Sequence, residues 1–203
     1  MADTGDLLLF RGSQFGSKIT RSFTGSNFDH VAMCLKFESD PDEIYYVDAT
    51  SNCGVAISKW SNTRKYIGEF YEQIMLRHLE FERSDELIDR LEIFLKEAVG
   101  HKYGLSTSKL LYSRPSLKPK EATYIEDGRT FFCSELIAKA YKSLGISNDD
   151  RSSSSFFPST FSAKGGLKLV EGAKLSPEFL IVPNPVQKGD VESDEETKGK
   201  LNK

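Results

Sequence analysis

Three residue types that together can carry out nucleophilic acyl transfer stand far apart in this chain. Cys133 lies in the stretch 130–141, Thr-Phe-Phe-Cys-Ser-Glu-Leu-Ile-Ala-Lys-Ala-Tyr, while His30 and Asp48 lie in two apolar segments upstream. A cysteine attacks a carbonyl as the thiolate, and it needs a base within hydrogen-bond reach that a third group orients. A cysteine, a histidine and a carboxylate would satisfy these needs if the fold brings them together.

The residues after Cys133 predict a helix, because apolar side chains recur there at helical spacing. These side chains are Leu136, Ile137, Ala140, Tyr141 and Leu144. Gly145 is suited to end the helix. We therefore expect Cys133 in or just before the first turn, where unpaired N–H groups and the helix dipole favour a thiolate. A buried structural cysteine is the alternative, since free cysteine is among the most buried residue types.

His30 is the candidate base among the three histidines. It heads the segment 30–37, whose alternating apolar residues predict a strand, and it follows a polar loop at 12–29, so it should lie at the rim of a sheet. His78 lies within an extended segment, and His101 follows a helix end, where a cation is favoured without any catalytic role. The alternative for His30 is a rim histidine that a backbone carbonyl satisfies.

Asp48 is the candidate for the group that orients the histidine. A turn at 39–42 and a second strand at 43–50 predict a hairpin, in which the start of one strand faces the end of the next. His30 and Asp48 should therefore be cross-strand neighbours. A carboxylate at that place can hold the ring tautomer and stabilise an imidazolium. Alternatively, Asp48 makes a local turn with the polar residues that follow it.

The remaining elements follow from periodicity and from breaker residues. We expect strands at 6–10, 55–58, 72–80 and 180–182, and a helix over 85–98 that Ser84 caps. The segment 104–128 predicts a long loop with a short helix at 106–111, and 151–155 a solvated linker. From residue 186 the charges have no apolar period. This predicts one domain over 1–185 and a disordered charged tail over 186–203.

Composition bounds the functions that the chain can have. Its 203 residues are 38% hydrophobic and 28% charged, which fits one globular domain with a real core. A net charge of −3 argues against nucleic-acid binding by bulk electrostatics. The polar, acidic start is unlike a secretory signal, and no apolar run approaches the ~18–20 residues that span a bilayer, so we expect no stable membrane insertion.

The three cysteines, Cys34, Cys53 and Cys133, form neither a CxxC pair nor a dense disulfide framework. Free thiols in a reducing, cytoplasmic setting are therefore expected. The sequence predicts no cofactor and no metal site, and it leaves the oligomeric state open.

A series of motifs resembles a known family. In chain order they are GDLLLFRG at 5–12, FDHVAM at 28–33, VDAT at 47–50 with GV at 54–55, VGHKYG at 99–104 and FCSEL at 132–136. This series is similar to the circularly permuted papain-like branch of the NlpC-type cysteine amidases, the YiiX-like enzymes. The resemblance covers about residues 5–145, and the cysteine segment with the upstream histidine strand is its most specific part.

The resemblance implies an α+β fold with an antiparallel sheet packed against the cysteine helix. It also implies that Cys133 is the nucleophile, His30 the general base, Asp48 the third member and Tyr103 a residue that lines the substrate cleft. Family members often carry Glu at the third position, where this chain has the shorter Asp48. The backbone N–H of Cys133 is then the candidate donor to an oxyanion.

Three functions remain open on this basis. The first is a hydrolase of peptide or other amide bonds, and the second is a lipid-directed acyltransferase or phospholipase of the lecithin:retinol acyltransferase-like type. The Cys-Ser-Glu-Leu motif differs from the asparagine-cysteine-glutamate signature of that second group. The third is a catalytically silent binding module, since a fold does not guarantee a function. The expected partner is a peptide, amide or lipid substrate.

Overall fold

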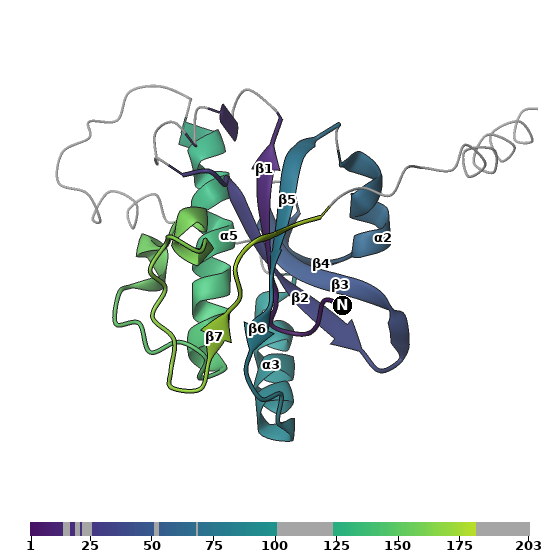
Figure 1. Cartoon of the computed structure of the whole chain (residues 1–203), viewed down its shortest axis with the longest axis vertical. Coiled ribbons are helices and arrows are strands. Elements are labelled where there is room, and N and C mark those ends of the chain that lie inside the picture. Colours follow the sequence, from purple (N-terminus) through teal and green to yellow (C-terminus); the bar gives the residue numbers. More distant parts are fainter. Residues whose placement is uncertain are drawn as a thin grey trace, which may run out of the picture.

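The computed structural model describes residues 1–13, 17–18, 21, 26–50, 53–67, 69–100 and 124–181, with side chains between 124 and 132 excepted. An antiparallel sheet with helices packed against it makes the fold α+β, as predicted (Figure 1). The six-stranded sheet has the order β4-β3-β2-β1-β5-β8. Its strands are β1 (Leu7–Gly12), β2 (His30–Phe37), β3 (Asp40–Thr50), β4 (Gly54–Lys59), β5 (Tyr71–Arg77) and β8 (Phe179–Leu180). A small second sheet pairs β6 (Leu79–Glu80) with β7 (Lys174–Leu175).

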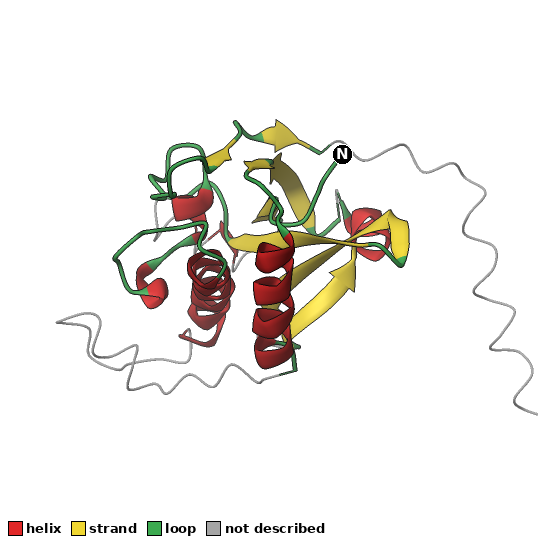
Figure 2. Cartoon of the chain, turned by 90° about the horizontal axis from the view of Figure 1, so that it is seen from below, coloured by secondary structure: helices red, strands yellow, loops and turns green. Residues whose placement is uncertain are grey.

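In the part of the chain that the structure describes, two long helices and several short helical elements accompany the sheet. The two long helices are α3 (Asp85–Ala98) and α5 (Tyr124–Ser143), and the short elements are α2 (Trp60–Thr63), η1 (Arg64–Tyr66), η2 (Ser153–Ser155) and η3 (Pro158–Phe161). The helix α5 packs on β2 and β3 and also contacts α3, whereas α2 contacts β3 and β4. Figure 2 shows the two long helices side by side and the short α2 apart from them.

The strand β1 explains how one sheet separates two apolar clusters. Leu7 and Leu9 join the cluster that includes the buried face of α5, while Leu8 and Phe10 join a smaller cluster on the opposite face. Successive strand residues point to opposite faces, so a strand buried on both sides needs an unbroken apolar run. The Leu-Leu-Leu-Phe run of β1 meets that need and places the middle of the sheet inside the molecule.

The helix α3 forms where it was predicted. The Ser84 side chain accepts a hydrogen bond from the Leu87 N–H, and Asp85 and Glu86 supply negative charge to the first turn. Leu87 and Leu91 are its buried residues. A capped N-terminus and a narrow apolar stripe therefore account for this element.

Several predicted boundaries are wrong. The first hairpin turns at residues 38–39, not 39–42, so β3 begins at Asp40 and includes Pro41. The expected strand 72–80 breaks at His78 into β5 and β6, because Asp6 bonds both the His78 ring and the next backbone N–H. The last strand among the described residues is β8, which ends at Leu180 and leaves out the predicted residue 181, and residue 182 lies outside the described residues. The short elements α2, η1, η2, η3 and β7 were not predicted.

The largest error concerns the start of the helix that carries Cys133. The helix α5 begins at Tyr124, so Cys133 is its tenth residue, and residues 124–128 are helical where a loop was expected. The predicted linker at 151–155 is also partly ordered: η2 contacts α5, and Arg151 binds Asp149 through two nitrogen atoms. The short helix at 106–111, Tyr103 and the charged tail lie outside the described residues.

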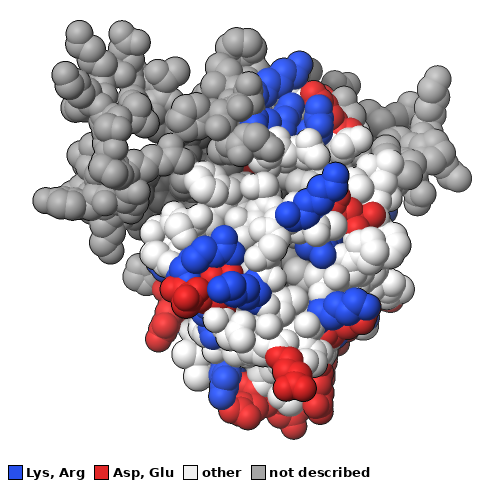
Figure 3. All heavy atoms as spheres, turned by 60° about the vertical axis from the view of Figure 1, so that its left-hand side comes forward, with Lys and Arg blue, Asp and Glu red and all other residues white. Residues whose placement is uncertain are grey.

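Basic and acidic side chains stand next to one another on the face seen in Figure 3. Exposed ion pairs at helical spacing, such as Arg90–Glu86 and Lys96–Glu92, show the same mixture on α3. Among the described residues, no helix combines the length and apolar character needed to cross a membrane.

Candidate active site

His30 is the first residue of β2 and lies at the end of the sheet. The register pairs it with Phe10 of β1, and the preceding Asp29 N–H donates to the Phe10 carbonyl at 3.0 Å. The Phe10 and His30 rings are 5.3 Å apart between centroids. Only 17% of the His30 side chain is exposed. Pairing with β1 on one side therefore fixes the backbone from which the imidazole extends.

Asp48 is a neighbour of His30, as the hairpin predicts. The register of β2 and β3 pairs Met33 with Val47, and its continuation places Asp48 diagonally across from His30 on the same face of the sheet. The distance between His30 Nε2 and Asp48 Oδ2 is 2.8 Å. Such a bond orients the imidazole and leaves its Nδ1 for a second partner.

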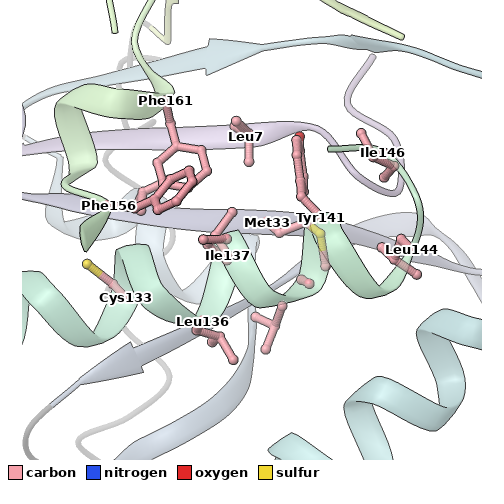
Figure 4. Packing of buried hydrophobic residues seen from close by; sticks show 14 of the residues in the cluster. Leu7, Met33, Cys133, Leu136, Ile137, Tyr141, Leu144, Ile146, Phe156 and Phe161 are labelled. Carbon is pink, nitrogen blue, oxygen red and sulfur yellow. The ribbon is translucent and has the colours of Figure 1, made fainter. Parts of the chain in front are cut away.

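Cys133 lies beside the same ring, because its charge and a hydrogen bond from its side chain are among the influences that raise the pKa of His30. The cysteine lies on the same face of α5 as Ile137 and Tyr141, directed at the sheet and at Phe156 (Figure 4). Its exposed fraction is 0%. His30 reaches the helix because it stands at the end of β2, where no further strand residue intervenes. The structure thus brings together three residues that lie 103 positions apart at most in the sequence.

The prediction that Cys133 stands in the first helical turn is wrong. Nine helical residues precede it, and the effect of the helix dipole is confined to the first turn. The N–H of an interior residue also belongs to the i→i−4 ladder, and only the first four N–H groups of a helix are unpaired. The backbone N–H of Cys133 is therefore not the oxyanion donor that the sequence predicted, and the helix N-terminus does not act on the thiol.

Electrostatics at His30 favour its protonated form. Burial lowers the pKa of His30, but the negative charges of Cys133 and Asp48, together with hydrogen bonds to both, raise the pKa well above the usual 6.5. The raised pKa keeps the His30 imidazole protonated beside the Asp48 carboxylate to a higher pH than for an ordinary histidine. This charge distribution is what a general acid for a leaving group requires.

We expect the His30 imidazole of the folded protein to titrate well above pH 6.5, and Asp48→Asn to lower that pKa. The amide of Asn keeps a hydrogen-bond acceptor but removes the negative charge that stabilises the imidazolium. Imidazole NMR signals followed against pH measure both effects, with His30→Gln identifying the resonance. An unchanged titration in Asp48→Asn would show that the carboxylate does not act on the ring.

The other candidate residues lie elsewhere. Cys34 is buried within β2, where burial raises the pKa of its thiol, and Cys53 is exposed in the turn before β4. His78 bonds Asp6 through Nδ1 at 2.7 Å and lies between β5 and β6. His101 and Tyr103 fall outside the described residues, so the predicted role of Tyr103 is untested.

Two groups beside His30 were missed from the sequence. The Phe10 ring packs against the imidazole, and a buried ion pair of Asp29 and Arg21 adjoins the start of β2. The only signal in the sequence was the position of Asp29 directly before the candidate base. The partner Arg21 lies in the polar stretch 12–29, whose sequence has no apolar period that would predict its contact with Asp29.

Among the described residues, no group of three or more His, Cys, Asp or Glu side chains could hold a metal ion. Comparison with known proteins gave little more. No family model matches the sequence, and no curated protein matches it. The crystal structure of the metalloprotein YiiX from Escherichia coli O157:H7 is similar at 16% identity and a TM-score of 0.48, over 90% of this chain and 98% of that chain.

Proposed function

We propose that this protein is a cysteine-dependent hydrolase of amide bonds. Cys133 is the nucleophile, His30 the general acid and base, and Asp48 the residue that orients His30. One observation carries the proposal: the His30 ring is bonded to Asp48 at 2.8 Å and to the thiol of Cys133. Nucleophile, base and orienting group in this arrangement form the unit that thiol-dependent acyl transfer requires.

The reaction follows from the charges at the site. The Cys133 thiolate attacks the carbonyl carbon, and the tetrahedral intermediate collapses as the carbon–nitrogen bond breaks. The departing amine takes the proton of the His30 imidazolium, which becomes neutral. The neutral His30 then removes a proton from water, the hydroxide attacks the thioester, and the thiolate leaves with the acid as product. Asp48 holds the ring in place throughout both steps.

The order of the elements supports a permuted papain-like fold of the NlpC type as the framework. His30 and Asp48 belong to sheet strands that precede the helix of Cys133 in the chain. The motifs that resemble this family occur on these same elements: the histidine at the start of β2, the aspartate in β3 and the cysteine within α5. The charged tail over 186–203, the cytoplasmic setting and the absence of a nucleic-acid partner belong to the same proposal.

Access to the thiol sets a condition on this function. With no exposed surface at Cys133, an acyl donor reaches the sulfur only after the atoms over it move. The thiol is also in contact with a largely apolar cluster, since Phe156 and Ile137 belong to the same buried group. The substrate-bound form therefore differs locally from this structure, and a dry surrounding strengthens the ion pair with His30 once the site closes.

Trapping of the acyl-enzyme tests the function. The protein is mixed with peptide amides, cell-wall peptides and phospholipid esters in separate reactions, and intact mass is measured after rapid acid quench. We expect an adduct at Cys133 from an amide donor, none in Cys133→Ala, and the same adduct in Cys34→Ala treated with the same donor, because Cys34 is a separate buried thiol.

The same experiment separates the alternatives. A fatty-acyl adduct from phospholipid alone would assign the chain to the lipid-directed class, because the acyl group identifies the donor. The absence of any adduct across all donors, with the thiol unreactive to small electrophiles, would favour a silent binding module and overturn the proposal.

A further inference from the structure

A buried ion pair lies immediately before His30 and outside the three residues of the proposed site. Arg21 Nη1 donates to Asp29 Oδ2, and the exposed fractions of the two side chains are 8% and 9%. Charged side chains are rarely buried to this degree unless they are paired and hydrogen-bonded. The pair is therefore a built feature of the fold, and its position beside the base raises the question of what it does there.

The hydrogen bonds of this pair tie the end of β1 to the start of β2. Both oxygens of Asp29 accept from the Gly12 N–H, at 3.2 and 3.0 Å, and Arg21 Nη1 donates to the Gly12 carbonyl at 2.8 Å. Gly12 sits at an irregularity in the register with β5, and a Cβ there would lie 2.5 Å from Ser17 Oγ. The end of β1 is therefore held by side-chain hydrogen bonds from Asp29 and Arg21, and not by further pairing with a neighbouring strand.

The backbone of residue 29 is held from the other direction as well. Its N–H donates to the Phe10 carbonyl at 3.0 Å, and the Phe10 ring packs against the His30 imidazole. The Cα of His30 follows directly. Two groups of Asp29, its carboxylate and its N–H, therefore determine where the imidazole begins.

We propose that Asp29, together with Arg21, is a positioning residue for His30, which it holds between Asp48 and Cys133. The idea rests on the proposed function, because a base that must bridge a carboxylate and a thiol needs a fixed backbone. Asp29 acts through the polypeptide and through its charge, and it touches no reacting atom. Arg21 offsets that charge, so Asp48 and Cys133 remain the groups that set the pKa of the imidazole.

The charges around His30 give this proposal a distinctive signature. Cys133 of α5 and Asp48 of β3 face the ring directly, and Tyr46 of β3 lies beyond the Phe10 ring. Asp29, directly before His30, is a third acidic group, and the charge of His30 lowers the pKa of its carboxyl. Its partner Arg21 is 3.7 Å from Glu72, which pairs with Arg11 of β1. Removal of the Asp29 charge leaves a buried cation near the imidazole, and removal of the Arg21 charge leaves a buried anion.

The test is an NMR titration of the His30 imidazole in the full-length protein and three variants. We expect Asp29→Asn to lower the pKa of His30 by ~0.5–1 pH unit and Arg21→Gln to raise it by a similar amount. The double variant, which restores the charge balance with neutral hydrogen-bonding side chains, should return the pKa to within about 0.3 unit of the parent. The rate of alkylation of Cys133 against pH should shift in step with each titration.

Asp149→Asn is the matched control, because Asp149 is 4% exposed, pairs with Arg151 and lies beyond the C-terminal end of α5. It should leave the His30 titration unchanged. If Asp29→Asn does not fold, Arg21→Gln and the double variant still carry different expectations, a raised pKa of His30 in the first and a value near that of the parent in the second. No shift in either single variant would overturn the positioning role, whereas shifts of one sign in both would support holding of the backbone without an effect of the two charges. Trapping of an acyl group on the parent protein is an independent result, so failure of this inference is distinguishable from failure of the proposed function.

Discussion

His30→Ala is expected to lower the rate of acyl transfer to Cys133 by about 10²–10⁴-fold near neutral pH, the range in which a general acid–base catalyst contributes. The variant loses both the proton donor to the leaving group and the cation beside the thiolate. Stopped acylation reactions with the amide donor identified by trapping measure the effect. Because His30 has a raised pKa, the parent should retain its proton donor at pH values where an ordinary histidine is neutral, and it should lose transfer as pH rises through that pKa.

His78→Ala is the control for this prediction. That residue has its own carboxylate partner, Asp6, and no contact with the candidate site, so its loss should leave acyl transfer within about twofold of the parent. Equal losses in the two variants would mean that the histidines act on folding and not on the chemistry.

Phe156→Ala is expected to destabilise the protein by about 3–5 kcal/mol, which is typical of a large aromatic removed from a core. The Phe156 side chain is fully buried, and its ring centroid is 6.0 Å from that of Phe161. The Arg151 guanidinium carbon lies 4.6 Å from the centre of the ring, which adds a cation–π contact. The Phe156 carbonyl also accepts a hydrogen bond from Ser134, the residue after Cys133. Urea unfolding followed by fluorescence or circular dichroism gives the free energy.

The comparison for this variant is Phe179→Ala in β8. Phe179 is 50% exposed, so its truncation should cost less than about 1 kcal/mol. If both substitutions destabilise the protein equally, Phe156 does not form the anchor between α5 and the segment that follows it. In that case packing against Phe156 would not be what holds Cys133 in place.

Local patterns predicted much of the sheet. The apolar run before Arg11 and the alternation after His30 gave β1 and β2, because strand period and burial on both faces leave a readable pattern. The exact turn was missed because Pro41 suggested a turn, while the structure admits it in the exposed start of β3. A two-residue strand such as β7 leaves no period at all, so tertiary pairing alone determines it.

The candidate site also has a part that local sequence predicts and a part that depends on tertiary packing. The hairpin predicted that His30 and Asp48 are neighbours, since register follows from a local turn. The contact of Cys133 with His30 needed the packing of α5 on the sheet, which motif order implied through the resemblance alone. The start of α5 was wrong because Gly128 and the aromatic pair at 131–132 are weak helix formers. Tertiary packing overrides such propensities and extends the helix toward its N-terminus. The predicted effect of the helix dipole on Cys133 is therefore wrong as well.

Alkylation of the folded parent protein by iodoacetamide at about pH 6, where an unperturbed thiol is mostly protonated, tests the central claim most directly. Peptide mass mapping reports the order in which Cys133, Cys34 and Cys53 react. The account predicts that Cys133 reacts first despite its burial, because the pKa of the neighbouring His30 is raised and its imidazolium lies beside the sulfur, and that His30→Ala moves this reaction to higher pH. Modification of the exposed Cys53 alone, with Cys133 unreactive until the protein unfolds and no effect of His30→Ala, would make Cys133 a structural thiol and contradict the account.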